Sequence, residues 1–150
     1  MRKLTRIRAI IAPGLWALVL VFPASCGASL DANDAIVDQG GRLYAVNCAS
    51  CHGASGEGQP EWKTVGPDGR YPAPPHDRTG HTWHHGDGLL FQIVKQGGAS
   101  LNVPGFQSGM PAFSDQLSDD EVRSVLGYLK TLWGPSERAF QARVTEQERR

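Results

Sequence analysis

The chain has 150 residues, with 15 lysines and arginines against 15 aspartates and glutamates, so its formal net charge is zero. That length suits one domain with its own hydrophobic core. Hydrophobic residues make up 40% of the chain, which excludes a wholly disordered protein, although 18 glycines and 10 prolines indicate long loops. The lack of a basic excess argues against a nucleic-acid-binding protein. Three cysteines cannot all pair with one another within the chain.

Residues 1–25 have the layout of a secretory signal peptide. Four basic residues precede an uncharged stretch that runs from Ala9 to Phe22. This stretch is short for a membrane-spanning helix, which needs about 20 apolar residues. An uncleaved membrane anchor is the alternative, since Pro13 and Gly14 are tolerated in such helices. Without residues 1–25 the chain keeps 11 basic and 15 acidic residues, a net charge of −4, which argues further against nucleic acid as a partner.

Cys26 follows Ala24 and Ser25 at the end of this segment. The arrangement resembles the cleavage box of bacterial lipoproteins, in which the cysteine becomes the lipid-bearing N-terminus. The usual leucine three residues upstream is replaced by Pro23. Lipidation of Cys26, which would tether the protein to the membrane, and ordinary cleavage, for example after Ala28, both stay open. In either case we expect export to the periplasm or to the outer face of the cell membrane.

Cys48, Cys51 and His52 form the pattern C-x-x-C-H, which is typical of covalent haem attachment. Two thiols about one helical turn apart can add to the two vinyl groups on one side of a porphyrin, and the next residue then directs its imidazole at the iron. An apolar-periodic stretch leads into the motif, so we expect a helix over residues 35–48.

Three other interpretations of the motif are weaker. A structural zinc site needs four ligands, and only two cysteines and one histidine gather here. A thioredoxin-like redox pair needs a surrounding βαβ pattern, which the sequence does not show. A disulfide between Cys48 and Cys51, across two intervening residues, is possible but strained. Covalent haem is therefore the interpretation that we favour.

Met110 is the only methionine apart from the initiator, and it lies far beyond His52 in the sequence. It stands between a glycine and a proline, after residues 103–108, whose composition is typical of a loop. A thioether in such a loop could reach a flat ligand without helical constraint. A gap-filling core methionine is the alternative.

Two further helices are predicted beyond the motif. Ser118 and Glu121 form a capping box, after which apolar residues recur at helical spacing up to Trp133. A shorter amphipathic stretch covers residues 87–97 and would turn one apolar face to a bound cofactor. Residues 135–150 have sparse apolar side chains, and we expect a flexible, solvated extension.

Together these features resemble the class I c-type cytochromes over roughly residues 35–134. The resemblance implies an all-α fold, with three to five helices around one covalently attached haem c and long loops. It implies thioether bonds from Cys48 and Cys51 and iron ligation by His52 and Met110. The domain division that follows is a signal peptide, a linker, a cytochrome c domain and a flexible tail, at residues 1–25, 26–34, 35–134 and 135–150.

In this family the first and last helices cross at a near-perpendicular angle. The corresponding residues here would be Gly40 or Gly41 with Tyr44 on the first helix, and Gly127 with Tyr128 on the last. A glycine at such a position lets the second helix approach closely.

The family also places a proline after the haem motif, whose carbonyl binds the free ring nitrogen of the ligand histidine. Pro74 or Pro75 fits this role. A leucine that packs on the haem commonly follows, but His76 stands in its place. This histidine could admit water or tune the reduction potential, although we favour a position on the surface.

Residues 80–85 contain three histidines and a tryptophan. His81, His84 and His85 could collect a copper or zinc ion, since imidazole suits both metals. Some members of the family have a Trp or His that donates a hydrogen bond to a haem propionate. We therefore favour a structural or propionate-binding role, with Trp83 as a candidate donor.

The resemblance implies a single-electron carrier rather than an enzyme. Its partners would be a redox donor and a redox acceptor that the sequence does not identify. A haem subunit of an envelope oxidoreductase, or a dedicated donor to one, is the first alternative. A peroxidase or gas sensor would need an open sixth position on the iron, and a copper-binding module would rely on His81, His84 and His85.

Overall fold

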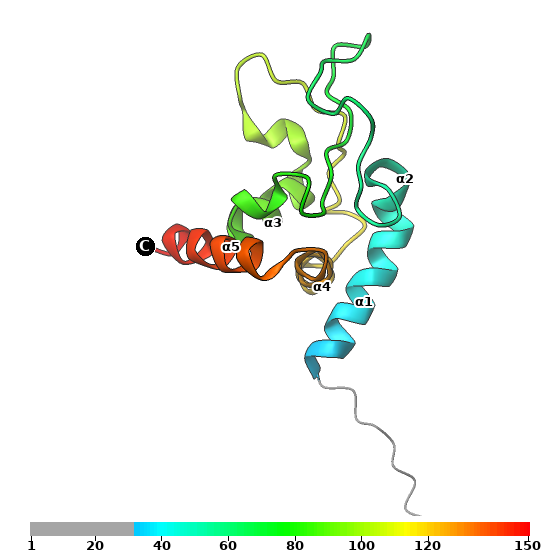
Figure 1. Ribbon diagram of the computed structural model, residues 1–150. Coiled ribbons are helices and arrows are strands. Elements are labelled where there is room, and N and C mark those ends of the chain that lie inside the picture. Colours follow the sequence, from blue (N-terminus) through cyan, green and yellow to red (C-terminus); the bar gives the residue numbers. More distant parts are fainter. Residues whose placement is uncertain (1–31) are drawn as a thin grey trace, which may run out of the picture.

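The computed structural model describes residues 32–150, and the regular structure along them is helical (Figure 1). Five α-helices and two short 3₁₀ helices are present, with no β-strand in this part of the chain. In chain order they are α1 (Ala32–Asn47), α2 (Ala49–His52), η1 (Thr82–His84), α3 (Asp87–Gln96), η2 (Gly98–Leu101), α4 (Asp119–Thr131) and α5 (Pro135–Glu148). The predicted all-α fold with long loops is confirmed.

Residues 1–31 lie outside the described part of the chain. The predicted signal peptide and the predicted lipidation or cleavage near Cys26 fall there. Helix α1 begins at Ala32, inside the segment expected as a linker, and its first turn carries Asp34, whose charge suits the positive end of a helix. None of the helices between residues 32 and 150 has the length and apolarity needed to cross a bilayer.

Helices α1 and α4 cross at a point where α1 has no side chain. Gly40 is buried, and a Cβ atom there would overlap the backbone carbonyl oxygen of Ser124. Tyr44, four residues later on the same face, is 1% exposed, and its ring centre lies 5.2 Å from that of Tyr128. Figure 1 shows α4 nearly end-on, while α1 rises obliquely in the plane of the picture, so the helices cross steeply. The expected crossing is present, but Gly40 meets Ser124 rather than Gly127.

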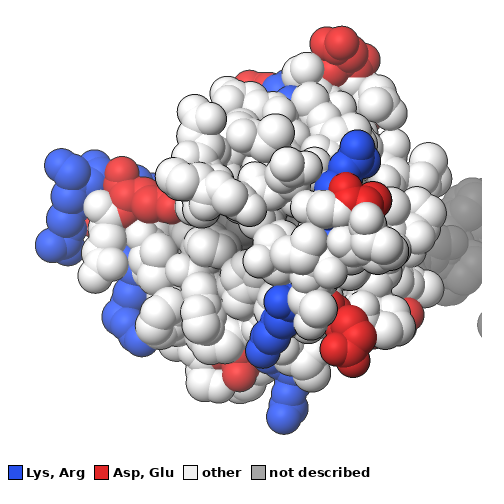
Figure 2. All heavy atoms as spheres, turned by 90° about the horizontal axis from the view of Figure 1, so that it is seen from above, with Lys and Arg blue, Asp and Glu red and all other residues white. Residues whose placement is uncertain are grey.

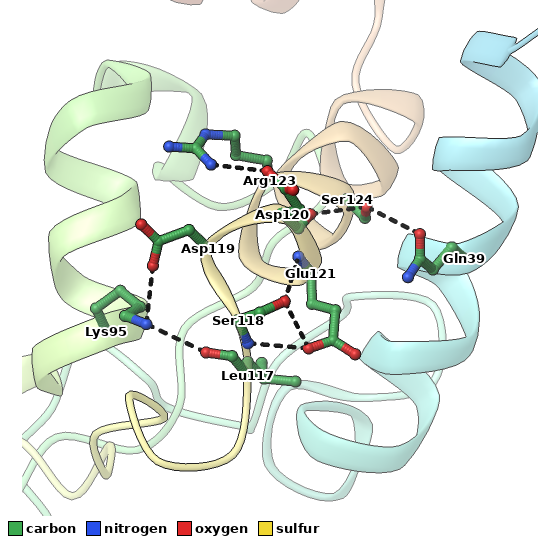
Figure 3. Close-up of polar contacts among 9 residues, drawn as sticks. All are labelled: Gln39, Lys95, Leu117, Ser118, Asp119, Asp120, Glu121, Arg123 and Ser124. Atoms are coloured by element: carbon green, nitrogen blue, oxygen red, sulfur yellow. Dashed lines mark hydrogen bonds and ion pairs between the residues drawn. The ribbon is translucent and has the colours of Figure 1, made fainter.

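The start of α4 is held by the predicted capping box. Ser118 Oγ accepts a hydrogen bond from the Glu121 N–H (3.3 Å), and Glu121 Oε2 accepts one from the Ser118 N–H (2.9 Å). Lys95 of α3 reaches the same place, because its Nζ lies 3.0 Å from Asp119 Oδ1 and donates to the Leu117 carbonyl (3.2 Å) (Figure 3). These contacts fix both ends of the long loop between α3 and α4.

The hydrophobic core is built mainly on α4. Its buried side chains recur every three or four residues, so they form one face of the helix, as predicted. The buried apolar residues on and just after this helix are Val122, Val125, Leu126, Leu129 and Trp133, each at most 5% exposed. Because burying one such side chain stabilises a fold by roughly 1.5–3 kcal/mol, α4 is the element on which the others depend.

Residues 135–150, expected to be a flexible and solvated extension, instead form helix α5 over Pro135–Glu148. A proline suits the first helical position, where its missing N–H costs no hydrogen bond. Gln141 is 2% exposed and Thr145 is 8% exposed, although α5 has few apolar residues. The sequence shows no hydrophobic periodicity over this helix, because the residues that the helix buries are polar.

The polar face of α5 binds the start of α3. Gln141 Nε2 donates to Asp87 Oδ1 (2.7 Å), and the Asp87 N–H donates to Thr145 Oγ1 (3.0 Å). Glu148 Oε2 accepts a hydrogen bond from the Gly88 N–H (2.9 Å). These partners satisfy N–H groups that α3 leaves free in its first turn, and the Glu148 carboxylate suits the positive end of that helix.

We predict opposite effects for two glycine-to-alanine substitutions at the contact between α1 and α4. Gly40→Ala should lower the free energy of unfolding by roughly 1–3 kcal/mol, because the new methyl group overlaps Ser124 and forces the helices apart. Gly127→Ala is the control, since its methyl group would lie 3.9 Å from Ile36. Alanine's helix propensity should then raise the free energy of unfolding by up to about 1 kcal/mol. Denaturant unfolding followed by circular dichroism measures both, and a Gly40→Ala variant as stable as the wild type would contradict the described crossing.

Candidate functional site

The end of α1 and the single turn of α2 bring three chemically reactive side chains to one cavity. Cys48 follows α1 directly, and its carbonyl oxygen accepts a hydrogen bond from the His52 N–H (2.9 Å). Cys48 is partly buried, Cys51 is exposed and His52 is 6% exposed, and all three line the cavity. Both thiols are free, so the alternative of a disulfide is not present. Burial, with a smaller contribution from Cys51, raises the pKa of the Cys48 thiol to about 11.

The His52 ring is held in one orientation by a backbone carbonyl. Its Nδ1 lies 2.8 Å from the carbonyl oxygen of Pro74. Because a carbonyl only accepts hydrogen bonds, Nδ1 carries the proton and Nε2 keeps a free lone pair, as a metal ligand needs. Burial lowers the pKa of His52, while the bond to Pro74 opposes this shift. Of the two prolines considered, Pro74 supplies the carbonyl and Pro75 is buried beside it.

A close backbone approach positions this carbonyl. Gly58 has φ +71°, and its N–H donates to the His52 carbonyl (2.7 Å). A Cβ atom on Gly58 would lie 2.5 Å from Pro75 N and 2.8 Å from the Pro74 carbonyl carbon. Only glycine therefore fits between the haem motif and the two prolines without moving one of them.

His76, expected on the surface, instead stacks on the ring of His52, with ring centres 3.9 Å apart and planes 24° apart. Its Nδ1 lies 2.9 Å from Thr82 Oγ1, and its side chain lines the same cavity. Burial and the neighbouring His52 hold the pKa of His76 well below its usual value. The reason for its position lies in the core, where Trp133 Nε1 donates to the His76 carbonyl (2.8 Å) and draws this segment inward.

Met110 lines the same cavity as His52 from a distant part of the chain. Its N–H donates to Ser108 Oγ (3.1 Å), and its carbonyl accepts from the Gly98 N–H (3.1 Å). Its side chain packs beside a buried cluster that includes Phe113. The backbone of Met110 is therefore fixed from two sides while its side chain forms part of the cavity wall.

The cavity has a volume of about 930 Å³, near the upper end of the range for cofactor sites. Helices α3 and α4 and the loop segments on both sides of Met110 supply most of its apolar wall. The apolar residues concerned are Leu90, Ile93, Val94, Phe106, Phe113, Val125, Leu126 and Leu129. Two free thiols, a ring nitrogen with a free lone pair and a thioether thus belong to one largely apolar cavity, and this donor set fits a covalently attached haem.

A polar part of the wall combines His81 and His85 with two residues that were not predicted from the sequence, Trp62 and Lys63. Trp62 stacks on His81, with ring centres 5.2 Å apart and planes 10° apart, and His85 meets His81 edge-on at 5.4 Å. These three residues and Lys63 line the cavity. Desolvation, and then the neighbouring histidines and Lys63, lower the pKa of His81. Trp62 and Lys63 lie in an irregular loop, so no periodic pattern indicates their position. The only feature of the sequence that could have indicated them is a tryptophan next to a lysine.

Trp83, expected to contact the cofactor, is not part of the cavity wall. Its ring packs on Phe140 of α5, at 5.6 Å between ring centres, and on His84 at 3.8 Å. His84 thus points to α5, while His81 and His85 belong to the cavity. Within residues 32–150 no group of three or more His, Cys, Asp or Glu side chains is arranged to hold a metal ion, so the alternative of a three-histidine copper site is not supported.

A family model described as Cytochrome c matches residues 37–133. No match was found among curated proteins, and none was found among solved structures. The matched span contains the C-x-x-C-H motif, Pro74 and Met110, and it ends before α5. It covers well over half of the chain, and the predicted all-α fold agrees with it. The chain belongs to the cytochrome c family and is a class I c-type cytochrome, with Cys48 and Cys51 in the position that attaches haem c.

Proposed function

We propose that this cytochrome carries single electrons in the bacterial cell envelope, using one haem c whose iron is bound by His52 and Met110. Haem-based electron transfer follows from the family, whereas the axial ligands and the cellular location are our proposal. The observation that carries it is that His52 and Met110, far apart in the sequence, line one cavity together with both thiols. The haem group supplies a one-electron couple between ferrous and ferric iron.

The residues that line the cavity would determine whether the reduction potential of the haem is raised or lowered. The Met110 thioether is a soft, uncharged ligand, which favours the ferrous state and raises the reduction potential. The apolar wall from α3 and α4 acts in the same direction, because a low-dielectric surrounding disfavours the additional charge of ferric iron. The Pro74 carbonyl acts in the opposite direction, because its hydrogen bond makes His52 a more basic ligand.

Two protein ligands on the iron would distinguish an electron carrier from a peroxidase or a gas sensor. If His52 and Met110 both bind the iron, as proposed, they would leave no position on it for peroxide or a diatomic gas. A peroxidase or a gas sensor needs such a position. The arrangement therefore supports electron transfer without turnover of a bound substrate.

The proposed location rests on the N-terminal segment, which lies outside the described residues. Members of this family are typically exported, and the basic start and short apolar stretch of residues 1–25 agree with export. Lipidation of Cys26 would tether the cytochrome to the membrane, whereas cleavage beyond it would release a periplasmic carrier. Its partners would be one redox protein that donates an electron and one that accepts it.

We predict that Met110→Ala converts a closed haem site into an open one. The variant should bind carbon monoxide in the ferrous state, and its reduction potential should fall by on the order of 100 mV or more, since axial ligands set haem potentials over about 0.8 V. Gln107→Ala is the control, because Gln107 is exposed in the same loop and uses its backbone carbonyl to bind the Tyr71 N–H. Visible spectra with and without carbon monoxide, and a redox titration, measure both variants. Ready binding of carbon monoxide by the wild type would refute the carrier function.

We predict that Gly58→Ala raises the reduction potential, because the new methyl group displaces the Pro74 carbonyl and weakens its bond to His52. The expected rise is on the order of 60 mV, which equals a tenfold change in the one-electron equilibrium. Gly105→Ala is a matched control, since Gly105 also has a positive φ of +78° but has nothing within 4 Å of the added Cβ atom. Both variants bear a similar backbone strain of roughly 1–2 kcal/mol. Equal potentials in the two variants would show that the Pro74 bond does not tune His52.

A further inference from the structure

The loop that carries Met110 is uncharged along its whole length. Residues 96–114 contain no Lys, Arg, Asp or Glu, although one residue in five of the chain is charged. Much of this stretch lies at the surface, and Val103 is 53% exposed. We call five of its exposed residues the neutral face, namely Ala99, Asn102, Val103, Pro104 and Gln107.

The neutral face contains a shallow recess of about 460 Å³ beside the haem cavity. All of the lining residues but Arg70 belong to residues 99–108. Arg70, Phe106 and Ser108 line both the recess and the haem cavity. These three side chains therefore separate the recess from the haem cavity. A protein bound at the recess would be separated from the cofactor only by this thin wall.

The recess has a fixed shape. The Tyr71 and Phe106 rings stack with their centres 5.5 Å apart, and the Tyr71 N–H donates to the Gln107 carbonyl (3.4 Å). Tyr71 also forms an isolated β-bridge with Ser108. A surface that is already ordered loses little conformational entropy when a partner binds, so even a small interface can form.

Figure 2 looks down on the end of the molecule where the long loops lie, and it shows a broad area of uncharged atoms around a central hollow, with most charged side chains toward the margin. Arg70 is the one charged residue of the recess. A Cβ atom on Gly109 would lie 3.5 Å from Arg70 Cδ, so this side chain runs along the Met110 loop. Among residues 32–150 the Arg70 guanidinium has no carboxylate within 4.0 Å.

We propose that the neutral face is the surface on which this cytochrome docks its redox partner, and that the partner presents an uncharged, partly apolar surface with one carboxylate for Arg70. A charged partner surface would lose hydration at the neutral face and gain no opposite charge in return. One electron then passes from the reduced protein to the oxidised partner, and no bond is made or broken. This inference rests on the proposed electron-carrier function.

A second copy of the chain is a suitable probe for the uncharged part of this surface, because its own neutral face is uncharged. It offers no carboxylate to Arg70, but Arg70 is unchanged in every variant compared, so the ratios between the rate constants report on position 103 alone. Electron self-exchange between reduced and oxidised holoprotein can be measured from NMR line broadening in mixtures of the two. Val103→Asp and Val103→Lys should each slow self-exchange about tenfold, because like charges meet across the interface. The controls are Ile36→Asp and Ile36→Lys, which change the net charge equally at a residue of similar exposure (47%) on α1.

The decisive measurement mixes the Val103→Asp and Val103→Lys proteins. If the two neutral faces meet, opposite charges now lie across the interface, and exchange between the variants should recover to within about threefold of the wild-type rate constant. Val103 variants that exchange at the same rates as the Ile36 variants of equal charge, or a mixture that shows no recovery, would overturn the docking face. A wild-type protein that takes up haem but exchanges no electrons would overturn the carrier function as well, so the two failures are distinguishable.

Discussion

The whole haem site depends on the contact between Gly40 of α1 and the backbone carbonyl of Ser124 in α4. Helix α1 leads directly into Cys48 and His52, and α4 begins shortly after the loop that carries Met110. The point at which the two helices cross therefore sets how far apart the haem motif and Met110 lie. Because no side chain separates the two helix backbones at Gly40, the haem motif and Met110 can line the same cavity.

The parts of the site that could be predicted from the sequence are those marked by a short motif or by a rare residue type. The C-x-x-C-H motif is a short pattern, and Met110 is the only methionine beyond the initiator, so both stand out without knowledge of the fold. The structure places both in one cavity, and it identifies Pro74 as the carbonyl that binds His52. The capping box at Ser118 could also be predicted, because its two hydrogen bonds connect residues only three positions apart.

The parts that could not be predicted depend on contacts between distant polar residues. Helix α5 buries Gln141 and Thr145 against the start of α3, and a polar face of this kind leaves no hydrophobic period in the sequence. Without knowledge of α5, the sequence also gives no sign that the Trp83 ring packs on Phe140. The family match ends at residue 133, so this helix is an addition beyond the matched span that decides which residues of the histidine-rich stretch reach the cavity.

We propose that His52 and Met110 bind the haem iron from opposite sides. The most direct test is the NMR spectrum of the ferrous holoprotein, prepared without residues 1–25 and with isotopically labelled methionine methyl groups, so that Met110 gives the only signal. A methyl group held against the iron lies over the centre of the porphyrin, whose ring current displaces its resonance far upfield. If Met110 binds the iron, one strongly displaced methyl signal is expected. A methyl signal at the ordinary methionine position, in a protein that holds its haem, would contradict it.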